Sequence, residues 1–120
     1  MAVVGAGEIG SAVASYKGFA NRGFKVAMVF DNDPTKVGST VGNFTVQDIA
    51  CMIEVIQNAG IQVAMIAVPA KHAQVVADQL AKAGVKAILN YAPVSLHLPP
   101  DVCVQYFDPA IHLQRMTYYL

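Results

Sequence analysis

The chain has 120 residues, a formal net charge of zero, 55% hydrophobic residues and 13% charged residues. This length and composition predict one domain whose core covers both faces of a sheet. There is no basic patch that would grip nucleic acid, no apolar run of the roughly 18 residues that span a membrane, and no basic segment of a signal peptide. We therefore expect a cytoplasmic protein with no membrane partner.

The first predicted strand, Ala2 to Val4, runs directly into the turn Gly5-Ala6-Gly7-Glu8-Ile9-Gly10. This is the Gly-x-Gly-x-x-Gly pattern of dinucleotide-binding sites. Gly5 allows the turn off the strand, Gly7 lets a pyrophosphate approach the backbone, and Gly10 lets the next helix pack against the sheet. The free N–H groups at the start of that helix favour a phosphate.

An acidic residue supports this interpretation. The turn leads into a helix predicted from Glu8 to Asn21, capped by Gly23, and then into a strand from Lys25 to Phe30. Asp31 follows about 20 residues after the last glycine, where an acid accepts hydrogen bonds from a ribose 2′-hydroxyl. Its charge would repel a 2′-phosphate, so the sequence predicts NAD(H) rather than NADP(H). The alternative is an ordinary strand-to-helix turn followed by a solvated aspartate.

Helices and strands alternate along the rest of the chain. The first predicted elements are a turn or helix start at Asp31 to Pro34, a loop from Val37 to Asn43, a short strand from Phe44 to Val46 and a helix from Asp48 to Gly60. A strand from Gln62 to Val68 follows, and then a helix that ends at Gly84 and has Ala73, Val76, Ala77 and Leu80 on one face. The last elements are a strand from Lys86 to Leu89, a loop from Asn90 to Pro93, a strand from Val102 to Phe107 and a closing helix from Asp108 to Leu120. This alternation predicts an α/β, Rossmann-type, doubly wound and mainly parallel sheet over residues 1–107, with a closing helix over 108–120.

Three turns should meet at the carboxyl ends of the strands, where such sheets bind ligands: Gly5 to Gly10, Ala67 to Ala70, and Asn90 to Pro93. Lys36 is either a contact to phosphate or adenosine, or a solvated lysine. We expect Asn90 to fix either the cofactor or a backbone carbonyl. The candidate cofactor-binding residues are Gly5, Ala6, Gly7, Glu8, Ile9, Gly10, Asp31, Lys36, Ala67, Val68, Pro69, Asn90, Tyr91, Ala92 and Pro93.

The same loops offer little for catalysis or metal binding. Neither Val68 to Ala70 nor Asn90 to Pro93 carries a His, Lys or Glu at its tip, and a catalytic pair at Lys71 and His72 is the less favoured interpretation. The three histidines lack the spacing of a metal site, so we predict no metal. Cys51 and Cys103 are expected to be buried small hydrophobes rather than a disulfide.

The sequence therefore predicts a sensor or regulatory module rather than an enzyme. Three alternatives remain open: the cofactor-binding half of a small NAD-dependent oxidoreductase, a CoA-binding domain, and a remnant that only dimerises. Only Met1 precedes the first strand, so we expect that an upstream domain has been lost or removed.

Several longer segments accompany the glycine motif, and the first and last of them are far more specific than it. They are Tyr16-Lys17-Gly18-Phe19, Phe30-Asp31-x-Asp33-Pro34-x-Lys36, Ile66-Ala67-Val68-Pro69-Ala70 and Asn90-Tyr91-Ala92-Pro93. With the glycine turn, they resemble the nucleotide-binding domain of the Rex family of redox-sensing transcriptional repressors. The resemblance covers essentially the whole chain.

The resemblance implies a homodimeric sensor of the NADH to NAD⁺ ratio. It implies that operator DNA is bound through a winged-helix domain that this chain lacks, and that the closing helix is swapped across the dimer; from the residues alone it is either swapped or folded back. It assigns Tyr16 and Asp108 to a redox-linked contact network, whereas their patterns alone indicate a buried helix residue and a helix cap. Glu8 departs from the neutral or basic residue expected at its position.

Overall fold

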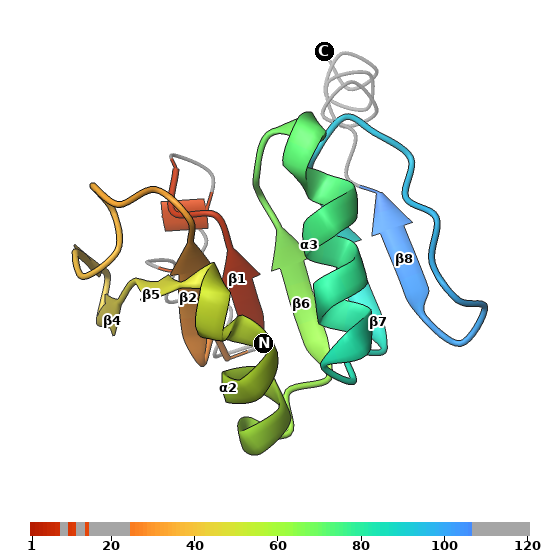
Figure 1. Cartoon of the computed structure of the whole chain (residues 1–120), viewed down its shortest axis with the longest axis horizontal. Helices are drawn as coiled ribbons and strands as arrows, with labels where there is room; N and C mark the ends of the chain where they lie inside the picture. Colours follow the sequence, from red (N-terminus) through yellow and green to blue (C-terminus); the bar gives the residue numbers. More distant parts are fainter. Residues whose placement is uncertain (8–9, 12–13, 15–24, 107–120) are drawn as a thin grey trace, which may run out of the picture.

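The computed structural model describes residues 1–7, 10–11, 14 and 25–106. A six-stranded parallel sheet lies at its centre. Its strands run in the order β5-β2-β1-β6-β7-β8, so the chain builds outward from the central β1 first to one side and then to the other (Figure 1). The bounds are β1 Ala2–Val4, β2 Met28–Asp31, β5 Gln47–Asp48, β6 Val63–Ile66, β7 Ala87–Asn90 and β8 Cys103–Tyr106. This is the predicted doubly wound α/β fold.

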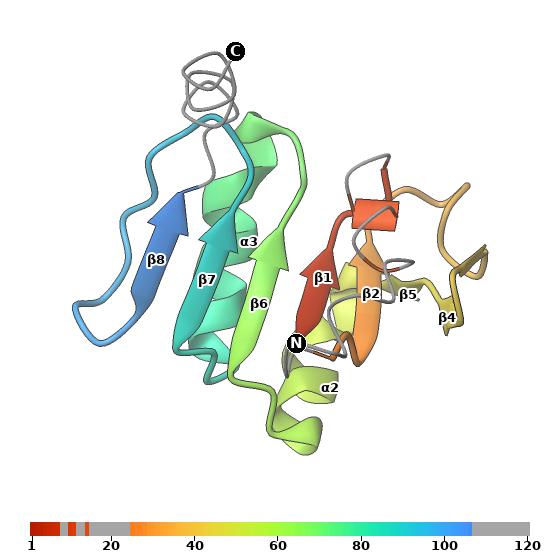
Figure 2. The same ribbon diagram turned by 180° about the vertical axis from the view of Figure 1, so that it is seen from behind.

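Two described helices, α2 (Met52–Ala59) and α3 (Ala70–Lys82), cover the same face of the sheet, as the opposite views in Figures 1 and 2 show. The predicted start of the first is confirmed, because the Asp48 side chain accepts a hydrogen bond from the N–H of Ala50. Its first turn is a 3-10 helix, η2 (Ile49–Cys51), and it ends at Gly60 in the left-handed conformation. Within the described residues, no helix is long and apolar enough to cross a membrane.

The main core lies between the sheet and these two helices. The four α3 positions predicted to share one face are all buried, and they pack with Phe30, Met52, Ile56 and Ile66. A second cluster around Val3, Val29 and Val46 lies on the other face of the sheet. The alternation of strand residues between the two clusters is the pattern expected of a sheet that is buried on both faces.

Two predictions about the region after β1 are wrong in detail. The second strand begins at Met28 rather than Lys25, because its partner β1 begins at Ala2, which lies opposite Met28 in the register. The segment predicted as loop from Val37 to Asn43 contains a strand, β3 (Thr40–Val41), which pairs antiparallel with β4 (Phe44–Thr45). A two-residue hairpin turn makes this pairing possible, and Gly42 adopts the positive φ of 58° there.

The prediction for the second cysteine is also wrong. Cys103 is exposed, because β8 is an edge strand of the sheet. Cys51 is half-buried in η2, and both cysteines are free thiols. Most of the helix predicted from Glu8 to Asn21, and the closing helix from Asp108, lie outside the described residues. The division at residue 107 and the swap of the closing helix therefore stay predictions.

Truncation of Leu80 to alanine should lower the free energy of unfolding by about 2–5 kcal/mol, because the side chain is fully buried against the sheet. Urea unfolding followed by circular dichroism measures this loss. Val75→Ala is the matched control, since Val75 lies on the same helix but is 61% exposed. Equal losses in the two variants would contradict the assigned face of α3.

Candidate functional site

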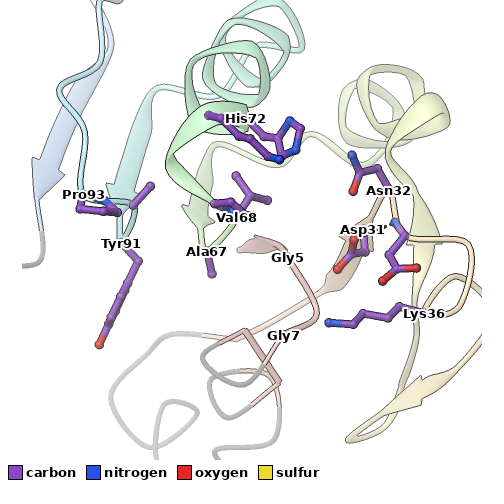
Figure 3. A pocket seen from close by; sticks show the side chains of 14 residues that line it. Gly5, Gly7, Asp31, Asn32, Lys36, Ala67, Val68, His72, Tyr91 and Pro93 are labelled. Carbon is purple, nitrogen blue, oxygen red and sulfur yellow. Dashed lines mark hydrogen bonds between the residues drawn. The ribbon is translucent and has the colours of Figure 1, made fainter.

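The three turns predicted to meet line one cavity of about 530 Å³ at the carboxyl ends of the strands (Figure 3). It lies above β1, between β2 on one side and β6 and β7 on the other, where the strand order reverses. Doubly wound sheets bind ligands at this place. The wall consists of Gly5, Gly7, Asp31, Asn32, Asp33, Lys36, Ala67, Val68, Pro69, Lys71, His72, Tyr91, Ala92 and Pro93.

Two of the three glycines are required by packing within the chain itself. Gly5 has a φ of 112°, and a Cβ atom built onto it would lie 2.5 Å from the carbonyl oxygen of Ala67. A Cβ atom on Gly10 would overlap the carbonyl oxygen of Gly5. The close approach predicted for Gly10 is therefore present, and these two positions fix the path of the chain where it leaves β1.

Gly7 is different, because none of the described residues imposes a packing constraint on it. Among the described residues, a Cβ atom there would meet only the Lys36 ammonium, at 3.8 Å, and Gly7 lines the cavity. The backbone of Gly7 is thus accessible to a ligand, which a side chain would keep at a distance. The Lys36 ammonium forms no ion pair with any described carboxylate, so it lies beside Gly7 with its charge available.

Asp31 has a structural role that the sequence did not reveal. Its side chain is 8% exposed. The carboxylate accepts hydrogen bonds from the backbone N–H of Ala6 at 2.8 Å and from that of Asp33 at 2.9 Å, one on each oxygen. Each oxygen has the capacity to accept a further hydrogen bond, and Asp31 lines the cavity. The residue predicted to bind a ribose therefore also ties the glycine turn to the end of β2.

Asp33 supplies a second carboxylate to the cavity wall, beside Asp31. Asp33 accepts hydrogen bonds from the backbone N–H and the hydroxyl of Thr35. The backbone hydrogen bond from Thr35 is the main cause that lowers the pKa of Asp33, and the hydroxyl bond and the charge of Lys36 act in the same direction. Asp33 therefore stays ionised at neutral pH and adds negative charge beside Asp31.

The opposite wall, Tyr91 to Pro93, is held by Asn90. This side chain is fully buried; its amide donates to the carbonyl of Val94 and its oxygen accepts from the N–H of Ala92, both at 2.9 Å. Asn90 belongs to β7 and does not line the cavity. Of the two roles predicted for Asn90, the structure shows the bond to a backbone carbonyl, and its role toward a cofactor stays a prediction.

The loop beyond this wall is fixed at two further points. The side-chain amide of Gln74 on α3 bonds to both the N–H and the carbonyl of His97, at 2.8 and 2.9 Å. The hydroxyl of Tyr106 accepts from the N–H of Leu96 at 3.0 Å. The wall is therefore set in place before any ligand binds, which reduces the entropy that binding must offset.

The remaining candidates fall into two groups. Ala6 and Gly10 shape the turn but do not line the cavity. Glu8, Ile9, Tyr16 and Asp108 lie outside the described residues. The sequence interpretation missed Asn32 and Asp33 as wall residues and weighed Lys71 and His72 only as a catalytic pair. Their positions next to strand ends were the available signal.

Comparisons with known proteins agree with this geometry. The family model described as CoA binding domain matches residues 1–94. The chain is 49% identical over all 120 residues to the redox-sensing transcriptional repressor Rex of Chloroflexus aurantiacus, and it covers 57% of that protein. It therefore spans little more than half the length of this relative.

Solved structures of RSP, a Rex-family repressor, have the same fold. The complex of RSP with β-NADH matches with a TM-score of 0.91 and 31% identity, over 98% of this chain and 57% of that one. The complex with β-NAD⁺ and operator DNA matches with a TM-score of 0.89 and 31% identity, over 98% of this chain and 54% of that one.

Alanine substitutions should separate the two kinds of glycine. Gly10→Ala should lower the free energy of unfolding by about 3 kcal/mol, because its methyl group overlaps the Gly5 carbonyl. Gly7→Ala should change it by less than about 0.5 kcal/mol, because its methyl group enters open space. Chemical denaturation measures both. A large loss in Gly7→Ala would show that this turn is constrained by the fold rather than left open for a ligand.

Proposed function

The chain belongs to the CoA-binding domain family, and on that premise we propose that it is the NAD(H)-binding, redox-sensing domain of a Rex-type transcriptional repressor. The observation that carries the proposal is the Gly7 backbone, which lines the cavity at the point where the strand order reverses, with Asp31 and Lys36 in the same wall. The likeness to Rex repressors over the whole chain supports it independently.

The middle of the cavity suits a pyrophosphate. Backbone N–H groups of a glycine-rich turn and the positive end of the helix after it attract phosphate oxygens. The Lys36 ammonium, 3.8 Å from where a Gly7 Cβ would stand, supplies a positive charge at the same place. In this proposal Gly7 and Lys36 hold the pyrophosphate, while Ala67, Val68 and Pro69 close the other side.

The carboxylate of Asp31 selects among dinucleotides. Its remaining lone pairs would accept hydrogen bonds from the hydroxyls of the adenosine ribose. NADPH carries a phosphate on the 2′-oxygen of that ribose, and CoA carries one on the 3′-oxygen. Both would meet the negative charges of Asp31 and Asp33. The same family fold would thus take NAD(H) here in preference to CoA.

The end of the cavity formed by Val68, Tyr91, Ala92 and Pro93 would receive the nicotinamide. Dihydronicotinamide is neutral, whereas the oxidised ring is a cation, and removing a cation from water without a counter-charge costs free energy. The reduced cofactor is therefore favoured. A sensor requires in addition that the two forms favour different arrangements of the protein.

The rest of the proposal concerns the whole repressor. We propose that the whole repressor is a cytoplasmic homodimer that binds operator DNA through another domain; the RSP complex with β-NAD⁺ and operator DNA supports the DNA binding. In it, Tyr16 and Asp108 would belong to the network that links the nicotinamide to the dimer, with residues 108–120 as the dimerising helix. Relatives named as repressors favour a regulator over a dehydrogenase.

Calorimetric titration of the purified chain tests the proposal. NADH should bind more tightly than NAD⁺ by roughly 5- to 150-fold, the usual range of a coupled effector. NADPH and CoA should bind much more weakly than NADH because of their ribose phosphates. Equal affinities for the two redox forms would remove the sensing role, and tight binding of CoA alone would replace NAD(H) as the ligand.

Two substitutions test the pyrophosphate contacts. Gly7→Ala should weaken NADH binding by about a hundredfold, because the methyl group occupies the approach to the backbone. Lys36→Met should weaken it by about tenfold through loss of one charge-assisted contact. Lys82→Met is the matched control, because Lys82 is exposed in the last turn of α3, outside the cavity wall. Unchanged affinity in Gly7→Ala would argue against this site.

A further inference from the structure

The cavity has a polar end beyond Asp31 that the contacts described so far leave unused. Asn32 lies there directly after β2, and His72 faces it from the first turn of α3. Figure 3 shows the Asn32 amide and the His72 imidazole directed toward each other, while Tyr91 and Pro93 lie at the other side of the view. Two segments about 40 residues apart in the sequence thus form one end of the cavity.

Both side chains stand on backbone that is held in place. Asn32 lies between Asp31 and Asp33, and the N–H of Asp33 donates a hydrogen bond to the carboxylate of Asp31. The N–H of His72 donates to the carbonyl of Pro69 at 2.9 Å, which closes the first turn of α3. Within the described part of the chain, neither side chain makes a hydrogen bond of its own. Their polar groups are therefore available to a ligand.

We propose that Asn32 and His72 recognise the base of the bound dinucleotide, Asn32 reading the edge of adenine and His72 packing on its face. This inference rests on the proposed function. The ribose held by Asp31 carries the adenine, and the wall residues next to Asp31 on the side away from Gly7 are the ones that this base can reach.

The chemistry of the two side chains fits the two surfaces of adenine. An asparagine amide pairs with the 6-amino group and N7, accepting from the first and donating to the second. An imidazole ring offers a flat surface for stacking, which tolerates any base. Adenine is neutral, so this recognition does not depend on the charges of Asp31, Asp33, Lys36 and Lys71 in the cavity wall.

Hypoxanthine is the informative comparison because it differs from adenine at this edge. It carries an oxygen in place of the 6-amino group, so the edge presents two acceptors and one asparagine contact is lost. The stacking face is nearly the same. The chain should therefore bind NADH about tenfold more tightly than its hypoxanthine analogue, reduced nicotinamide hypoxanthine dinucleotide.

Calorimetric titrations of two variants separate the roles. Asn32→Ala should weaken NADH binding by more than about tenfold, through loss of both contacts, and the analogue by a smaller factor, through loss of the contact to N7, so that the preference for adenine disappears. His72→Ala should weaken both ligands by a similar factor, about tenfold, and keep the preference. Asn58→Ala on α2 and His97→Ala on the loop are matched controls, because both residues are exposed and outside the cavity wall.

The outcomes separate this inference from the proposed function. Equal affinity of the unmodified chain for NADH and the analogue overturns the role of Asn32 and leaves the proposed function intact. A preference for adenine that survives in Asn32→Ala also overturns it. Unchanged affinities in His72→Ala remove the stacking role. Failure of the unmodified chain to bind NADH at all overturns both proposals.

Discussion

The end of β1 leaves no room for side chains, and the site depends on this constraint. The N–H of Gly5 donates to the carbonyl of Phe30 on β2 at 2.7 Å, while the carbonyl of Val4 accepts from Ala67 after β6 at 2.8 Å. The chain is therefore held from both sides as it turns. A Cβ atom on Gly5 or Gly10 would collide with backbone. The described part of the turn accordingly borders the cavity at Gly5 and Gly7.

The two sides of this turn differ in chemistry, and the difference comes from the strands that flank it. On the side of β2, Asp31 ties the turn in place and leaves charge and hydrogen-bonding capacity facing the cavity. On the side of β7, the polar groups of the Asn90 side chain bond to the backbone of Ala92 and Val94, and the wall that follows is mainly apolar. A ligand with a polar and an apolar end joined by phosphates matches this arrangement, and a change of charge at the apolar end is what such a cavity detects best.

Patterns that are local in sequence predicted much of this arrangement. The glycine spacing, the acid after the second strand and the buried face of α3 each follow from periodicity or from one strand end. The bond between Asp31 and the N–H of Ala6 joins residues 25 positions apart, and no local pattern encodes it. Strands of two residues, such as β3 and β5, carry too little alternation to be recognised. The exposure of Cys103 depends on which strand forms the sheet edge, which only the assembled order decides.

The most direct test of this account is a crystal structure of the chain with NADH. The account predicts the pyrophosphate over Gly7, the adenosine ribose on Asp31, and the nicotinamide beside Tyr91 and Pro93. Electron density for the dinucleotide outside this cavity, or in the reverse direction with adenine against Tyr91, would contradict the assignment of the glycine turn and of the two ends of the cavity.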